Sequence, residues 1–205
     1  MQYFVWGTDV PNSKERRHPL QRAHWDFIAS YDEKLIARGP ILDSDNPTVL
    51  RGSMHIVELD GPEEARHFAY DEPYAKDGLF SEIVVRRFSL ELGRTQFEFR
   101  LDPARERYMV ICDANPGAVL PPAIAAAAEA HYREWDKDMV CRGSFLDDAG
   151  NWDGHLFFME VDNRANLDRF LADDPCAKAR LYRKTEARRW TLGGPENLRL
   201  VGLVK

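Results

Sequence analysis

The sequence is poor in the features that mark secreted, membrane-spanning and nucleic-acid-binding proteins. Its three cysteines, Cys112, Cys141 and Cys176, are too few and too far apart for a disulfide scaffold. No apolar run approaches the roughly 18 residues that a transmembrane helix needs, and Asp9 interrupts the apolar N-terminal stretch early. The net charge is -6, from 34 acidic and 28 basic residues, which argues against a nucleic acid partner. We expect a soluble, cytoplasmic protein with reduced cysteines that binds neither nucleic acid nor a membrane.

Motifs for cofactors and metals are also missing. Neither the dinucleotide pattern G-x-G-x-x-G nor the phosphate-binding pattern G-x-x-x-x-G-K-[ST] occurs. No Cys-x-x-Cys or His-Glu-x-x-His pair offers the spacing of metal ligands. We therefore expect no flavin, nicotinamide or nucleotide cofactor and no metal ion.

What the sequence does contain is an internal repeat. Residues 52–92 align without gaps on 154–194, and the aligned pairs include Phe68 with Phe170 and Pro73 with Pro175. Further upstream the offset grows, until Ala23-His24-Trp25 aligns with Ala130-His131-Tyr132. The gaps fall where a loop or a helix end can absorb them, so the alignment indicates a duplication.

Each half predicts the order β-α-β-β-α-β, which is typical of a ferredoxin-like fold. In the first half the expected strands are 2–7, 40–43, 54–59 and 83–90, with a helix before Gly39, a second helix over 61–70 and a loop over 71–78. Segments 95–101 and 198–204 alternate like extra strands. The fold class expected is α+β. It has two tandem ferredoxin-like domains, 1–101 and 102–205, whose open sheets pack face to face.

Each half also carries one histidine on the apolar face of its first predicted helix. His24 lies among Leu20, Phe27 and Ile28 at helical spacing, and His131 occupies the aligned stripe in the second half. A neutral imidazole suits proton transfer near pH 7. The alternative is a half-buried core histidine with one hydrogen bond.

An acid behind His24 would fix its tautomer, and three residues are candidates. Asp9 ends the first predicted strand, while Asp71 and Glu72 precede Pro73 in the loop. Each of the three has the alternative of a solvated carboxylate at a loop or helix end. Asp174 is the counterpart of Glu72 in the second half.

Arg17 is the candidate anion-binding residue, because a guanidinium holds a carboxylate or phenolate at two points. Tyr74 is the candidate aromatic wall for a planar substrate, and Asp71 a further candidate for binding it. The second half has no basic residue corresponding to Arg17, and Cys176 replaces Tyr74. We therefore predict one working site, in the first half.

Residues 2–92 resemble the YciI (YCII-related) family. The resemblance rests on Tyr3-Phe4-Val5, Asp9, Arg17, Ala23-His24, Gly39-Pro40, Gly52-Ser53 and Pro73-Tyr74-Ala75-Lys76-Asp77-Gly78-Leu79. It implies a ferredoxin-like fold that pairs as a dimeric α+β barrel, and it places the family's suspected catalytic histidine at His24. The family usually has aspartate directly before the loop proline, where this chain has Glu72. One relative is similar to a dehydrochlorinase that acts on a hydroxylated aromatic ring.

These observations favour a cofactor-independent lyase or isomerase that acts on a small anionic or hydroxylated aromatic compound. His24 would be the acid/base, with Asp9 or Glu72 beside it. The alternative is a non-catalytic small-ligand binding or accessory protein of the same fold. A homodimer is compatible with either, because the barrel can close within one chain or between two.

Overall fold

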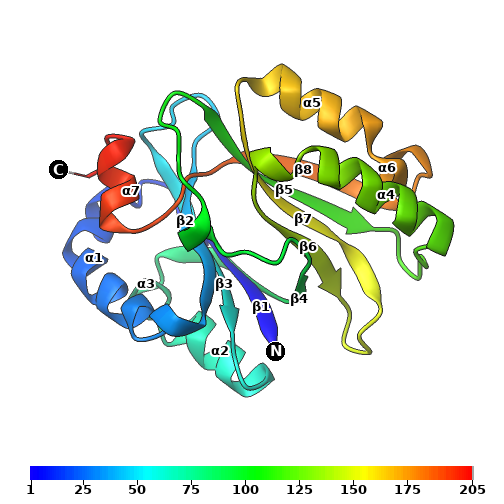
Figure 1. Cartoon of the computed structure of the whole chain (residues 1–205). Helices are drawn as coiled ribbons and strands as arrows, with labels where there is room; N and C mark the ends of the chain where they lie inside the picture. The colour runs from blue at the N-terminus through cyan, green and yellow to red at the C-terminus, as the bar shows by residue number, and fades with distance from the viewer. Residues whose placement is uncertain (205) are drawn as a thin grey trace. The chain divides into compact units, whose positions relative to one another are not determined.

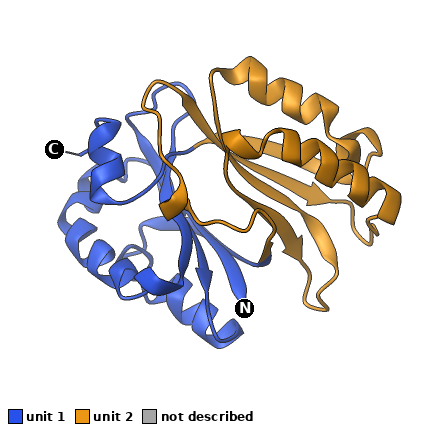
Figure 2. Ribbon diagram, in the orientation of Figure 1, with its two compact units in different colours: residues 1–88, 190–205 blue, residues 89–189 orange. Residues whose placement is uncertain are grey.

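A computed structural model describes residues 1–204, and these divide into two compact units (Figure 2). The first unit holds residues 1–88 together with the C-terminal segment that begins at Trp190. The second unit holds Ser89–Arg189. Each unit has its own sheet, helices and core, so each is described separately.

The sheet of the first unit is antiparallel, in the strand order β2-β3-β1-β4, and helices pack on it (Figure 1). Its elements are β1 (Gln2–Asp9), α1 (Lys14–Ala29), the 3-10 turn η1 (Asp32–Lys34), β2 (Leu35–Leu42), β3 (Leu50–Glu58), α2 (Pro62–Tyr70), α3 (Pro73–Lys76), β4 (Phe80–Leu90) and α7 (Pro195–Leu200). Its core joins Tyr3 and Val57 of the sheet to Ile28 of α1 and Phe68 of α2. Burying these apolar faces is what holds the helices on the sheet.

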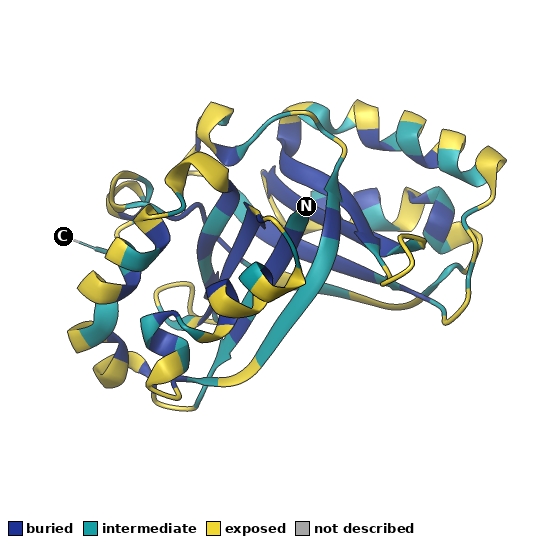
Figure 3. Ribbon diagram, turned by 90° about the horizontal axis from the view of Figure 1, so that it is seen from below, coloured by how far each residue is buried: buried dark blue, intermediate teal, exposed yellow. Residues whose placement is uncertain are grey.

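The second unit repeats the order of elements, with the sheet order β6-β7-β5-β8. Its elements are η2 (Gln96–Glu98), β5 (Glu106–Ala114), α4 (Pro122–Glu134), η3 (Asp136–Asp138), β6 (Met139–Leu146), β7 (Trp152–Val161), α5 (Arg164–Asp173), α6 (Pro175–Lys178) and β8 (Tyr182–Arg189). Val110, Phe157 and Phe170 lie at the centre of its core. Strands β4 and β8 are partly exposed, the three other strands of each unit are largely buried, and the outer faces of the helices are exposed (Figure 3).

The α+β class and the ferredoxin-like element order are confirmed, but the units do not divide at the predicted 101/102 boundary. The amide of Glu91 donates to the carbonyl of Arg142 in the second unit, at 3.0 Å. At the corresponding point of the first unit, the amide of Gly193 donates to the carbonyl of Arg38, at 2.8 Å. Gly39 must be glycine here, because a Cβ would collide with the backbone carbonyl of Thr191.

Two predicted strands are absent from the described residues 1–204. Segment 95–101 contains the turn η2, where Thr95 and Glu98 form a reciprocal capping box. Segment 198–204 contains the end of α7, which Pro195 starts. The predicted loop 71–78 contains the four-residue helix α3. No helix of residues 1–204 has the length and apolar character needed to cross a bilayer.

Candidate active site

His24 and Glu72 form a buried hydrogen-bonded pair in the first unit. His24 projects from α1 and Glu72 lies between α2 and α3, and their side chains are 9% and 5% exposed. His24 Nδ1 lies 2.9 Å from Glu72 Oε2. Within residues 1–204 the other ring nitrogen, Nε2, has no hydrogen-bond partner, yet it is not among the fully buried unpaired nitrogens. It is therefore the nitrogen that a ligand can reach.

The position of Glu72 is set by the short helix that follows it. Its Oε2 accepts from the amide of Tyr74 at 3.0 Å, and its Oε1 accepts from the amide of Ala75 at 3.2 Å, so Glu72 is the N-cap of α3. Because the carboxylate oxygens accept from these amides, the His24 bond is assigned with Nδ1–H as donor. Neutral His24 then carries its lone pair on Nε2, which is the tautomer that a general base requires.

Arg17 and Asp9 form a second buried pair beside the first. Arg17 Nε and Nη2 donate to the two Asp9 oxygens, each at 2.6 Å, and Nη2 also donates to Ser53 Oγ at 3.2 Å. Burial alone would lower the pKa of Arg17, but the hydrogen bonds and charge of Asp9 raise it, so the guanidinium stays charged. Asp9 therefore orients Arg17 rather than His24. The charge of Arg17 is already balanced by this carboxylate.

Tyr74 connects the two pairs through its ring. The guanidinium carbon of Arg17 lies 4.6 Å from the Tyr74 ring centre, and the His24 ring stacks on Tyr74 with centres 4.2 Å apart. Burial raises the pKa of the Tyr74 phenol, although Arg17 opposes that shift. The ring of Tyr74 thus fixes the plane of His24, and it is not an open wall for a substrate.

Asp71 lies outside this arrangement. Its side chain is 41% exposed and pairs with His67 and Lys76 on the surface. The hydrogen bonds to Lys76 and His67 lower its pKa. Of the three acids considered from the sequence, the structure brings only Glu72 to His24.

A small cavity lies next to the His24–Glu72 pair. Its lining includes Ser53, His55, Glu72 and Phe80. His55 was missed in the sequence, although one signal was present: Arg51, Ser53 and His55 alternate as polar residues along β3. Gly7 also lines this cavity, where a Cβ would press against the Phe80 ring at 2.6 Å.

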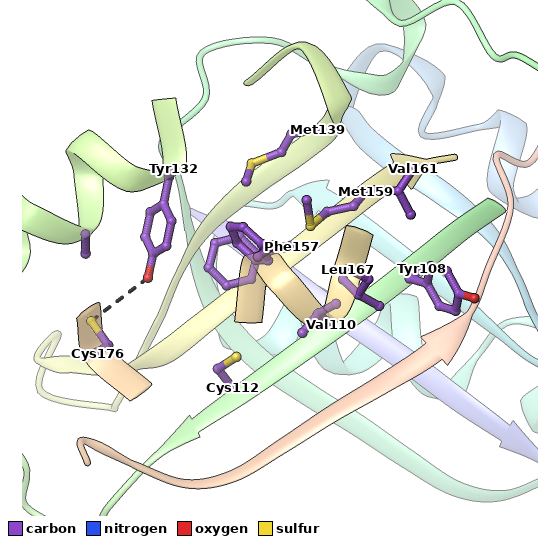
Figure 4. Close-up of a cluster of buried hydrophobic side chains, with 12 residues drawn as sticks. Tyr108, Val110, Cys112, Tyr132, Met139, Phe157, Met159, Val161, Leu167 and Cys176 are labelled. Atoms are coloured by element: carbon purple, nitrogen blue, oxygen red, sulfur yellow. Dashed lines mark hydrogen bonds between the residues drawn. The ribbon is translucent and has the colours of Figure 1, made fainter. Parts of the chain in front are cut away.

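In the second unit the matching carboxylate is surrounded by protein donors. Asp174 caps α6, its Oδ1 accepting from the amide of Cys176 at 2.7 Å and from the Tyr132 hydroxyl at 3.2 Å. Its Oδ2 accepts from the Tyr182 hydroxyl at 3.1 Å. Figure 4 shows Tyr132 reaching from α4 toward α6, with its hydroxyl beside the Cys176 sulfur at 3.9 Å. Burial raises the pKa of Asp174 and of both tyrosines.

The predicted correspondence of His131 with His24 is wrong. The turns that end the two helices match, because Tyr31 N donates to Ile28 O and Trp135 N donates to Tyr132 O. Counting back from these turns places Ala128, buried in α4, opposite His24. His131 is instead stacked on Phe170 and bonded through Nε2 to the Phe170 carbonyl at 3.0 Å. The three-residue match in the sequence was one turn out of register.

No group of three His, Cys, Asp or Glu side chains within residues 1–204 has an arrangement that would hold a metal ion. The cysteines are buried and unpaired, and burial raises the pKa of the Cys176 thiol to about 11. The chemistry of the site therefore has to be argued from the imidazoles, the carboxylate and the aromatic rings.

Comparison with known proteins assigns the first unit to a protein family. Residues 1–89 match the YCII-related domain. Protein YciI of Escherichia coli O6:H1 is 30% identical over 94 residues, which are 43% of this chain and 96% of that protein. The chain belongs to the YCII-related family. The matched domain contains the whole His24–Glu72 arrangement, and the match ends where the second unit begins.

Solved structures extend the likeness in fold to both units. Chlorite dismutase from Candidatus Nitrospira defluvii, 10% identical, matches 98% of this chain and 93% of its own with a TM-score of 0.61. At that identity the match shows the fold alone. The dehydrochlorinase TftG from Burkholderia phenoliruptrix is 26% identical over 44% of this chain and 96% of its own, with a TM-score of 0.42. That TM-score is too low to transfer its substrate to this member of the YCII-related family.

Proposed function

We propose that the first unit is a lyase or isomerase in which His24 transfers a proton on a small hydroxylated or anionic compound, without a nucleotide cofactor. The observation that carries the proposal is the buried 2.9 Å contact between His24 Nδ1 and Glu72, which leaves Nε2 accessible. A histidine that only packed in the core would satisfy its polar atoms within the protein. His24 keeps one nitrogen for an outside partner.

The geometry supports a simple sequence of proton movements. Nε2 of neutral His24 accepts a proton from a carbon or hydroxyl of the substrate, and the electron pair of the broken bond stays on the substrate. The imidazolium that forms is stabilised by Glu72, which accepts from Nδ1. In an isomerase Nε2–H then returns the proton at another atom. In a lyase the retained pair forms a new double bond, while a neighbouring group leaves with the electron pair of its own bond and takes the proton from Nε2–H. The ring of Tyr74 keeps the imidazole plane fixed during both steps.

The second unit lacks this chemistry in our proposal. Its carboxylate Asp174 already accepts from two tyrosine hydroxyls and one amide. Phenols whose pKa is raised by burial do not ionise near pH 7 and so cannot act as a base there. We infer one working site in each chain, with the second unit in a structural role.

Deuterium exchange tests the proposal on a set of compounds, so the substrate need not be identified first. A panel of small hydroxylated aromatic and hydroxy-carbonyl compounds is incubated with the full chain in heavy water, and the loss of carbon-bound proton signals is followed by NMR. We expect exchange with the wild type and a reduction of about 10²–10⁴-fold in His24→Gln. Glu72→Gln should lose part of the rate, because the tautomer is no longer fixed.

His131→Gln is the matched control, since His131 is the histidine on the first helix of the second unit and is bonded to a backbone carbonyl. It should exchange like the wild type. Equal rates in His24→Gln and wild type would contradict the proposal. Binding of panel compounds without exchange of any carbon-bound proton would favour a ligand-binding protein instead.

A further inference from the structure

A second histidine, His55, faces the same site and has no assigned role. It lies in the middle of β3, is 7% exposed and lines the cavity together with Ser53 and Glu72. Its ring centre is 5.9 Å from that of His24 and 5.4 Å from that of Phe68, to which it is edge-on. Within residues 1–204 neither of its ring nitrogens has a hydrogen-bond partner.

An imidazole that is mostly buried and has no partner in the protein needs a reason. The His55 nitrogens are not among the fully buried unpaired atoms of residues 1–204, so a water or a ligand group in the cavity can be their partner. The strand register places Phe157 of the second unit at the position of His55, because Val5 pairs with His55 and Val110 pairs with Phe157. The fold therefore accepts an apolar ring at this point. The histidine is not required for packing.

The surroundings keep His55 neutral. Burial, and then the charges of His24, Arg38 and Arg17, lower the pKa of His55 well below its ordinary value. A neutral imidazole offers one N–H donor and one nitrogen acceptor. That pair of groups matches a hydroxyl or a carbonyl oxygen better than a charged group.

The charges around the cavity also favour an uncharged ligand. No lysine or arginine among residues 1–204 lines the cavity, whereas Glu72 does. Of the two arginines whose charges act on His55, Arg17 is held at two points by Asp9 and Arg38 donates to Asp32 at 2.9 Å. An anion entering here would lose its hydration without gaining an unpaired positive charge. The sequence-based expectation of an anionic ligand thus has no support from the cavity.

We propose that His55 binds the oxygen of an uncharged hydroxyl or carbonyl group of a small ligand, while His24 moves the proton. The proposal rests on the function proposed for His24 and adds a substrate class to it. His55 is then a residue that holds the substrate. In the bound state its ring nitrogen has the partner that the protein does not supply.

The test uses the full chain and two probes of similar size, catechol as the uncharged phenol and benzoate as the anion. Binding is followed by NMR of the histidine ring signals, from millimolar concentrations up to the solubility limit. We expect catechol to shift the signals of His55 and His24 and to leave those of His131 and His67 unchanged. Benzoate should bind at least tenfold more weakly than catechol.

His55→Val should weaken catechol binding about five- to tenfold, the loss of one net hydrogen bond. His55→Gln, which keeps a donor and an acceptor, should restore part of the affinity. His67→Val is the matched control, because His67 is exposed on α2 and lies outside the cavity lining. The melting temperature of His55→Val should stay near that of the wild type, because the second unit carries an apolar residue, Phe157, at the matching position.

Three results would overturn the proposal: equal catechol affinity in wild type and His55→Val, tighter binding of benzoate than of catechol, or no shift at His55 with catechol. The wild-type measurements decide the last two even if a variant folds poorly. The two proposals fail separately. Loss of deuterium exchange in His24→Gln together with unchanged binding in His55→Val would keep the function of His24 and remove that of His55.

Discussion

Both units place a carboxylate before the proline that starts a four-residue helix, but they surround it with different donors. In the first unit Glu72 accepts from His24, and in the second Asp174 accepts from Tyr132 and Tyr182. The carboxylate caps its helix in both cases, so its presence alone says nothing about catalysis. What differs is the donor. An imidazole gains and loses a proton near neutral pH, whereas a buried phenol does not.

The space beside the carboxylate is also more filled in the second unit than in the first. At four matched positions the second unit carries a larger or more polar side chain, the pairs being Gly7 and Cys112, Ile28 and Tyr132, Ser53 and His155, and Phe80 and Tyr182. His155 Nδ1–H donates to the Tyr182 hydroxyl at 2.7 Å, because Nε2 accepts from Trp152 and Tyr182 donates to Asp174. Tyr132 also donates to Asp174, so three of these positions are linked to that carboxylate. One fold thus supports an open site in one unit and a filled one in the other.

Removing each carboxylate should have the largest effect on stability, and the effect should differ between the two units. Asp174→Ala removes a helix cap and leaves two buried hydroxyls without their acceptor, so we expect it to lower the free energy of unfolding by about 3 kcal/mol. Glu72→Ala should lower it by about 1–2 kcal/mol, because only His24 and the cap are affected. Urea denaturation of the two variants measures the difference. An equal or reversed order would show that the two carboxylates are not used differently.

Filling the cavity of the first unit with larger side chains should make the two units alike. Ile28→Tyr places in α1 the residue that the second unit has at the matching position, and it should weaken catechol binding by roughly 30-fold or about 2 kcal/mol. Phe27→Tyr adds the same hydroxyl on a partly exposed neighbour and serves as the control. Ser53→His tests the same point from β3. Unchanged binding in both cavity variants would place the ligand elsewhere.

Acid should destabilise the protein through the buried His155 of the second unit. Burial lowers the pKa of His155 from 6.5 to about 3, so below pH 6.5 the unfolded chain binds more protons than the folded one. The free energy of unfolding should therefore fall as the pH drops from 6.5 towards 3, by up to about 1.4 kcal/mol per pH unit for this histidine.

His155→Gln does not titrate and should flatten this slope, as measured by urea denaturation at several pH values. His67→Gln is the control on an exposed histidine. An unchanged slope in His155→Gln would mean that His155 is protonated in the folded state. His55, whose pKa is also lowered by burial, should add a similar slope that His55→Val removes.

Much of the fold could be predicted from the sequence because its elements carry local signals. Strand alternation, the apolar stripe of α1 and the Pro62 entry of α2 gave the element order. Alternation wrongly predicted a strand over 95–101. There the side chains of Thr95 and Glu98 each accept a hydrogen bond from the other's backbone amide and stabilise a helical turn. Such a cap depends on side-chain hydrogen bonds that hydrophobic periodicity does not record.

The site was predicted in part. His24 and Glu72 were both named, but the sequence also left Asp9 and Asp71 as partners and offered Arg17 as a free cation. Only the folded chain brings Asp9 to Arg17 and leaves Asp71 on the surface. The match of His131 with His24 failed because a three-residue identity within a helix does not fix the register.

The sequence by itself determined the repeated element order, the family of the first unit and the place of His24 on the apolar face of the first helix. These follow from local periodicity and from motifs that are contiguous along the chain. The tertiary structure alone decided which carboxylate meets His24, that His55 and Glu72 line one cavity, and that Tyr132 and His155 fill the matching space in the second unit. Those contacts join residues far apart in the chain, and their geometry depends on helix register and side-chain volume.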